Sequence, residues 1–180
     1  MIDRALSAIT NELNDYLKRS FKIEGDQVVL GKLGSQLGSN DEGENKIICA
    51  LVNVKEEEVV SPQSQFNKGN ILQNKPIYLN LTLVFAANFS DYSSSLKFLS
   101  SVIGFFQSKQ VFTSQNTPAL SAGMVDKIMV ETVNLDTTEL SNLWSMMGAE
   151  YVPSIVYKLR VAAIDQQNIL PEIATVDIVS

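Results

Sequence analysis

The chain has 180 residues, enough for one domain with a substantial core. Its net charge of −6 argues against a nucleic-acid partner, because such partners are bound by clusters of Lys and Arg. The chain has no His, which excludes the Ser-His-Asp and Cys-His mechanisms, and its single Cys, Cys49, excludes an internal disulfide.

The first element that we expect is an amphipathic helix over residues 2–19. The segment lacks the basic start and apolar stretch of a signal peptide, and no apolar run approaches the roughly 20 residues of a membrane helix. We therefore expect a soluble protein that is made in the cytoplasm and has no membrane partner. The apolar residues that recur at helical spacing are Ile2, Ala5, Leu6, Ile9, Leu13, Tyr16 and Leu17.

Three strands are predicted next, over residues 27–33, 46–57 and 77–89. The second is apolar at successive positions, which favours a central strand covered on both faces. A Gly, Asn, Asp and Ser loop separates the first two strands. The connection over residues 59–76 is long and polar, and a loop of that length in a compact domain is usually functional or mobile.

A second helix is predicted from residue 91 to about residue 108. Ser90 precedes it and is a residue type that caps helix N-termini. The buried face of this helix is expected to comprise Tyr92, Leu96, Leu99, Ile103 and Phe106.

A short extended piece and a loop over residues 110–123 lead to a strand over residues 126–135. Asp136 and Glu139 have the spacing of a capping box, and Gly148 suits the end of the third helix.

The last predicted strand covers residues 153–164 and has Pro at its start. Trp144, Tyr151 and Tyr157 are expected to fix the angle between this strand and the third helix. The predicted fold class is α/β (α+β), with a single mixed β-sheet flanked by about three α-helices.

Residues that could carry chemistry are few. Gly31, Gly34 and Gly38 do not have phosphate-loop spacing, and Ser93 and Lys97 form a Ser-x-x-x-Lys pair on a predicted exposed face, which is not the spacing of acyl-enzymes. The acidic loop over residues 40–45 lacks the alternating ligands of an EF-hand. Cys49 alternates with apolar residues and is expected in the core. We therefore predict no enzyme activity, no cofactor and no metal.

Four stretches together resemble one family: MIDRALSAITNELNDYL, ICALVNVKEEE, PIYLNLTLVFAANFSDYSSSLKFLSSVIGFFQSKQVFTSQNTPAL and LSNLWSMMGAEYVPSIVYKLRV. They are similar to the N-terminal domain of tail-cap, or tail-terminator, proteins of extracellular contractile injection systems. Those systems are phage-tail-like particles of the Photorhabdus virulence cassette and antifeeding prophage type. The resemblance covers residues 1–164, which we expect to form the tail-cap domain, similar in fold to phage tail terminators.

The resemblance implies a structural role. Such a protein forms a homo-hexameric ring at the baseplate-distal end of the particle, terminates the inner tube and anchors the last sheath layer. Its partners would be other copies of itself, the inner-tube protein and the sheath protein, without cofactor, nucleic acid or membrane. It would be cytoplasmic during assembly. The alternative is a monomeric adaptor or assembly chaperone of the same particle.

Two groups of residues are candidates for the interface. Phe105, Phe106, Phe112 and Gln115 lie at the end of the second helix and in the following loop, although the three Phe side chains could equally pack in the core. The C-terminal tail, residues 165–180, has strand character and could act as an exchanged or added strand through Thr175, Val176 and Ile178.

Overall fold

The computed structural model describes residues 1–34, 44–57, 78–123 and 125–163. The predicted connection over residues 59–76 and the C-terminal tail lie outside these ranges. The elements, in chain order, are α1 (Ile2–Phe21), β1 (Val28–Leu30), β2 (Lys46–Glu56), β3 (Tyr78–Asn88), α2 (Tyr92–Ser108), β4 (Val111–Thr113), the 3₁₀ helix η2 (Pro118–Gly123), β5 (Val125–Val133), α3 (Thr137–Met147) and β6 (Ser154–Ala163).

The described strands form one six-stranded sheet in the order β1-β2-β3-β6-β5-β4. β1 runs parallel to β2, and every other neighbouring pair is antiparallel. The predicted fold class is confirmed: one mixed sheet with three α-helices in the described part of the chain. The short extended piece expected after the second helix is the edge strand β4.

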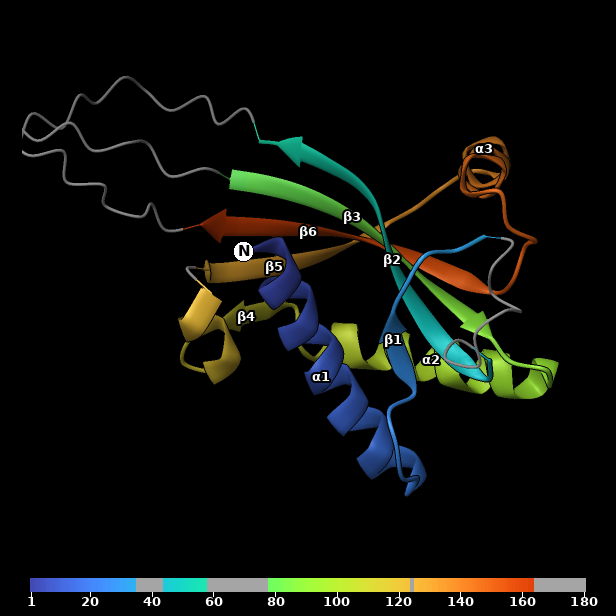
Figure 1. Ribbon diagram of the computed structural model, residues 1–180, viewed down its shortest axis with the longest axis horizontal. Coiled ribbons are helices and arrows are strands. Elements are labelled where there is room, and N and C mark those ends of the chain that lie inside the picture. Colours follow the sequence, from blue (N-terminus) through green and yellow to red (C-terminus); the bar gives the residue numbers. More distant parts are fainter. Residues whose placement is uncertain (35–43, 58–77, 124, 164–180) are drawn as a thin grey trace, which may run out of the picture.

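One face of the sheet, called the first face below, is covered by α1 and α2 (Figure 1). Alternate strand residues point to this face and pack against both helices, because side chains alternate across a strand. Phe85 on β3 lies at its centre, with ring centroids 5.3 Å from Phe106 and 5.9 Å from Tyr157. The largest fully buried side chains in the core of the first face are Ile9, Leu13, Leu17, Ile47, Leu81, Leu83, Phe85, Phe112, Leu120, Ile128 and Leu159.

The helix α1 follows the predicted amphipathic pattern and also positions the first strand. Its buried Asn14 accepts hydrogen bonds at Oδ1 from the backbone N–H groups of Gln27 and Val28, both at 2.8 Å. The Asn14 amide donates to the Val28 carbonyl at 2.9 Å. One side chain therefore satisfies three backbone groups at the start of β1, where the sheet has no further described strand to do so.

The helix α2 differs from the prediction at its cap. The N-cap is Asp91 and not Ser90, since the Asp91 carboxylate accepts from the backbone N–H of Ser94 at 2.9 Å and of Ser93 at 3.4 Å. Ser90 instead donates to Asn45. The bonds that Asp91 accepts from Ser93 and Ser94 hold its pKa below the ordinary value. The Ser94 hydroxyl, which donates to the Asp91 carboxylate at 2.7 Å, contributes most.

The predicted buried face of α2 was also largely wrong. The residues that meet the core are Ser95, Val102, Phe105 and Phe106. Phe106 was predicted correctly, and Leu99 packs partly against the core. The other three predicted members, Tyr92, Leu96 and Ile103, are exposed.

The opposite face of the sheet, called the second face below, carries α3 at one end (Figure 1). The predicted capping box is present: Glu139 N–H donates to Asp136 at 2.8 Å, and Asp136 N–H donates to Glu139 at 3.0 Å. Gly148 ends the helix with φ of 61°, in the left-handed region that favours glycine. Trp144 packs on the sheet beneath α3.

The predicted aromatic corner is confirmed in one part and wrong in another. The rings of Trp144 and Tyr151 meet edge to face at 5.5 Å, so they connect α3 to the segment before β6. Tyr157 lies on the first face among the core phenylalanines and does not join them.

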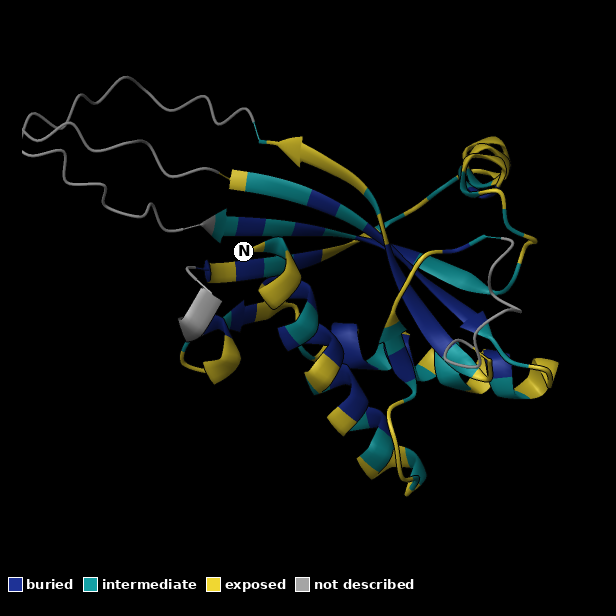
Figure 2. Ribbon diagram, viewed as in Figure 1, coloured by how far each residue is buried: buried dark blue, intermediate teal, exposed yellow. Residues whose placement is uncertain are grey.

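The strand β2 is central over its first half, as predicted, because four successive residues from Ile47 to Ala50 are buried. Its second half is exposed from Asn53 to Glu56. Figure 2 shows this change along a single strand. The sequence predicted cover on both faces throughout, so the second half is a correction.

Candidate interaction surfaces

The candidate interface at the end of α2 divides into buried and exposed residues. Phe105, Phe106 and Phe112 are 5%, 3% and 0% exposed and pack in the core of the first face, which is the alternative left open by the sequence. They offer almost no area to a partner. Gln115 is exposed in the turn after β4. Thr175, Val176 and Ile178 lie outside the described residues.

The loop after α2 is held by one lysine. Lys109 Nζ contacts Glu12 Oε2 at 2.6 Å and donates to Thr117 Oγ1 at 3.0 Å. It also lies 4.7 Å from the centre of the Phe112 ring. The segment that carries Gln115 is therefore tied to both α1 and the core.

Reactive groups are not gathered into a site in the described part of the chain. Cys49 is buried on β2, and burial raises the pKa of its thiol to about 12, so the nucleophilic thiolate is scarce at neutral pH. No group of three or more His, Cys, Asp or Glu residues there could hold a metal ion. No helix among the described residues is long and apolar enough to cross a membrane.

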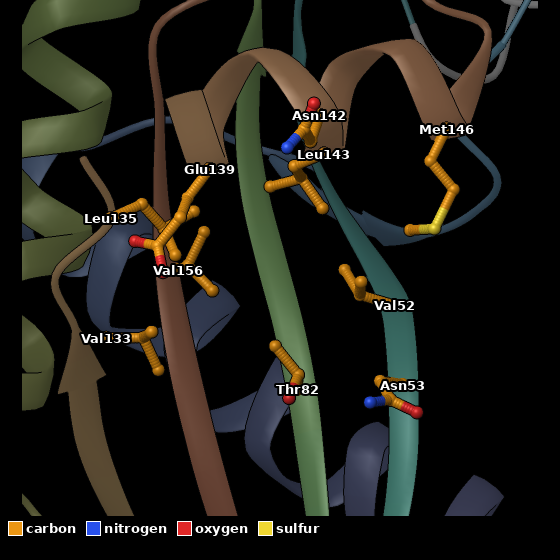
Figure 3. A pocket seen from close by; sticks show the side chains of 10 residues that line it. All are labelled: Val52, Asn53, Thr82, Val133, Leu135, Glu139, Asn142, Leu143, Met146 and Val156. Atoms are coloured by element: carbon orange, nitrogen blue, oxygen red, sulfur yellow. The ribbon is translucent and has the colours of Figure 1, made fainter. Parts of the chain in front are cut away.

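An open cleft of about 360 Å³ lies where α3 meets the second face. Figure 3 shows Leu143 and Met146 of α3 on one side and Val52, Thr82 and Val156 of the sheet on the other. Its walls are mainly apolar, and the carboxylate of Glu139 is engaged in the helix cap. Such a cleft can receive an apolar side chain.

Beyond the cleft, the second face carries a network of ion pairs. Arg160 on β6 forms two hydrogen bonds to Glu57, and its Nη1 lies 3.6 Å from Glu131. Lys158 lies 3.6 Å from the other oxygen of Glu131. The bonds from Arg160 hold the pKa of Glu57 below its ordinary value. Each carboxylate pairs with an arginine or a lysine, and all of these side chains are partly exposed. The network is therefore a charged surface in contact with solvent.

Two apolar surfaces outside the cleft were not foreseen. Tyr92, Leu96 and Ile103 recur along α2 and are 67%, 44% and 42% exposed. Leu51 and Val54 on β2 are 41% and 42% exposed. The helical spacing of the first group is visible in the sequence, but the prediction places these three residues in the core. Exposed apolar groups that share one element are typical of surfaces that contact other proteins.

Comparison with known proteins places this fold. The chain superposes over 100% of its length on the sheath/tube terminator of the PVC extracellular contractile injection system, with a TM-score of 0.61 and 11% identity. It superposes over 96% of its length on the tube-terminating cap of the anti-feeding prophage, with a TM-score of 0.57 and 12% identity. The matches span 65% and 60% of those chains, less than two thirds of their length.

No curated protein matches the chain. The family model of the Pvc16 N-terminal domain matches residues 5–177, which is nearly the whole sequence. The four sequence stretches, the mixed sheet with its three described helices and this match agree. The chain belongs to the Pvc16 N-terminal domain family.

Proposed function

We propose that this protein is a structural cap of a phage-tail-like contractile injection system. It forms a ring at the baseplate-distal end, terminates the inner tube and anchors the last sheath layer. The observation that carries the proposal is the fold shared along the whole chain with a sheath/tube terminator. The protein acts by binding and turns over no substrate.

The surfaces of the chain support a binding role. A closed ring requires each copy to contact its neighbours through two different surfaces. The apolar side of α2 and the exposed half of β2 are two such surfaces, on different elements. The described residues gather no nucleophile with a base, and the chain has no His. Its partners are other copies, the inner-tube protein and the sheath protein, met in the cytoplasm during assembly.

The proposal is tested by deleting the gene in a producing strain and imaging the particles. We expect inner tubes and sheaths of uncontrolled length or poor stability, and restoration by the full chain supplied in trans. Particles of normal length would overturn the terminator role. Native mass spectrometry of the full chain with pre-assembled tube and sheath tests the ring. A six-fold assembly supports it, and a single bound copy favours a monomeric adaptor instead.

The tail has a separate test within the same function. Removing residues 165–180 is expected to weaken attachment to the sheath while the domain stays folded. Circular dichroism reports the folding, and co-purification with the sheath reports attachment. Unchanged co-purification would count against a role for the tail in that attachment.

A further inference from the structure

The outer edge of β2 is uncovered over its second half. β1 pairs with Ile47, Ile48 and Cys49, and no described strand pairs with the outer side of β2 beyond them. After Gly31 the chain turns away, and Leu33 joins the core beneath α3. The second half of β2 therefore forms the rim of the sheet and is exposed in Figure 2.

Backbone hydrogen bonds show which residues face this edge. The carbonyl of Cys49 accepts from Gly31 N–H at 3.1 Å, so the backbone groups of Cys49 point outward. Since outward and inward residues alternate in an antiparallel strand, those of Leu51 point outward too.

The far end of β2 shows the same alternation of outward and inward backbone groups, displaced by one residue. Glu57 N–H donates inward to the Tyr78 carbonyl at 2.8 Å, so Val54 and Glu56 point outward. The shift is the irregularity in register between Leu51 and Asn53. The edge thus presents, at three positions spread along half of the strand, backbone donors and acceptors that pair with no other described residue.

The side chains at this edge have distinct characters on the two faces. Leu51 and Val54 point to the first face, since they pair with the buried Leu83 and Leu81. Both are about two fifths exposed. Lys55 points to the second face and forms no ion pair with another described residue. An added strand would meet Leu51 and Val54, followed by Glu56, on one face and the positive charge of Lys55 on the other.

We propose that residues 173–179 of a neighbouring copy add to this edge of β2 as a further strand. Their sequence, IATVDIV, places Val176 and Ile178 on one side and Asp177 on the other. With the apolar pair beside Leu51 and Val54, Asp177 lies on the same face as Lys55. Backbone pairing supplies affinity, and these side chains fix the register.

The added strand comes from a neighbour because the connections of the sheet oppose an internal arrangement. β2 and β6 both run antiparallel to β3, so they end at the same end of the sheet. A chain leaving β6 for the outer edge of its own β2 would cross the connection over residues 58–77, and such crossings are avoided. A neighbouring tail needs no crossing. The inference rests on the proposed function, in which copies lie side by side.

Disulfide trapping between full-length chains tests this contact. One preparation carries Val54→Cys with a size tag and the other carries Val176→Cys, and the two are mixed under mild oxidation. The native Cys49 is buried and does not compete. The matched control replaces Val54→Cys by Val111→Cys on β4, the strand at the opposite edge of the sheet, because Val111 has a similar exposure of 38%.

We expect the Val54→Cys mixture to form the crosslinked dimer at least about tenfold faster than the control, since docking raises the effective concentration of the pair. Equal rates would overturn the proposal. A chain carrying both Val54→Cys and Val176→Cys should crosslink between copies. Its closure within a single chain would also overturn the proposal, and would show that the tail covers its own sheet.

Failure of this inference is distinguishable from failure of the proposed function. If crosslinking fails while deletion of the gene still gives tubes of uncontrolled length, the chain is a terminator that joins its neighbours elsewhere. Normal tube length after deletion would remove the function itself, whatever the crosslinks show.

Discussion

The two faces of the sheet differ in what covers them. The covered residues hold the fold together, and the uncovered ones are available for contacts with other molecules. The first face is closed by α1 and α2 and holds most of the buried apolar side chains. The second face is closed by α3 at one end and elsewhere carries a cleft and ion pairs. A substitution of a residue buried beneath these helices should therefore unfold the domain, whereas one at an uncovered position of either face should leave the fold intact.

The largest expected effect is at the centre of the first face. Phe85→Ala removes a fully buried ring that contacts Phe106 and Tyr157, and we expect the free energy of unfolding to fall by about 3–5 kcal/mol. Tyr78→Ala, on the second face of the same strand, is the matched control. Because Tyr78 is 37% exposed, its loss should cost about 1 kcal/mol or less. Urea unfolding compares the two, and similar costs would break the distinction between faces.

The next effect is polar and lies at the junction of α1 with the sheet. Asn14→Leu keeps the branching at Cγ but leaves three backbone groups of the β1 segment without the Asn14 amide, which should cost about 2–3 kcal/mol. Asn11→Leu, an exposed position one turn earlier, should stay within about 0.5 kcal/mol. If both variants unfold at the same urea concentration, water replaces the Asn14 bonds and β1 is not held by them.

A smaller effect is expected where α3 begins on the second face. Asp136→Ala removes the capping box and should cost about 1 kcal/mol, since the helix N-terminus loses its acceptor. Asp136→Asn retains an acceptor and should cost less. Trp144 is the chain's single Trp, and its fluorescence reports α3 directly. An Asn variant as unstable as the Ala variant would show that charge, and not the hydrogen bond, matters at this cap.

Much of the fold could be predicted from the sequence because its signals are local. The capping box at Asp136 and Glu139 and the stop at Gly148 involve residues within one turn of each other. The helical period of α1 likewise needs no distant contact. The family resemblance came from such stretches, and the family match confirms it.

What could not be predicted depends on how elements pack. The helix α2 has two apolar sides, and periodicity alone does not tell which one meets the sheet. The pairs of Phe98 with Phe21 and of Phe105 with Tyr16 rotate the helix toward α1 and leave Ile103 exposed. The exposure of β2 beyond Leu51 similarly depends on where β1 stops pairing with β2, and that is determined by tertiary packing and not by the local sequence.

The smallest effect on stability is expected within the ion pairs of the second face, and it depends on pH. The side chains of Arg160 and Glu57 are 35% and 22% exposed, so water screens their interaction. The pKa of Glu57 in the folded state lies below its ordinary value of 4.5, chiefly because Arg160 donates to it. The unfolded state therefore binds the proton more readily, and the contribution of the pair is present above pH 4.5 and disappears as the pH falls through the folded pKa.

Arg160→Gln should lower the melting temperature slightly at pH 7, and the difference from the native chain should shrink as the pH is lowered toward 3. In a chain that already carries Glu57→Gln, the same substitution should show a smaller pH dependence, because only the contact of Arg160 with Glu131 is then left to lose. Thermal unfolding of the four chains at several pH values makes the comparison. A loss at pH 7 as large as that of Phe85→Ala would mean that this face also holds the fold together. The open surface would then be part of the core architecture and could not be altered for assembly alone.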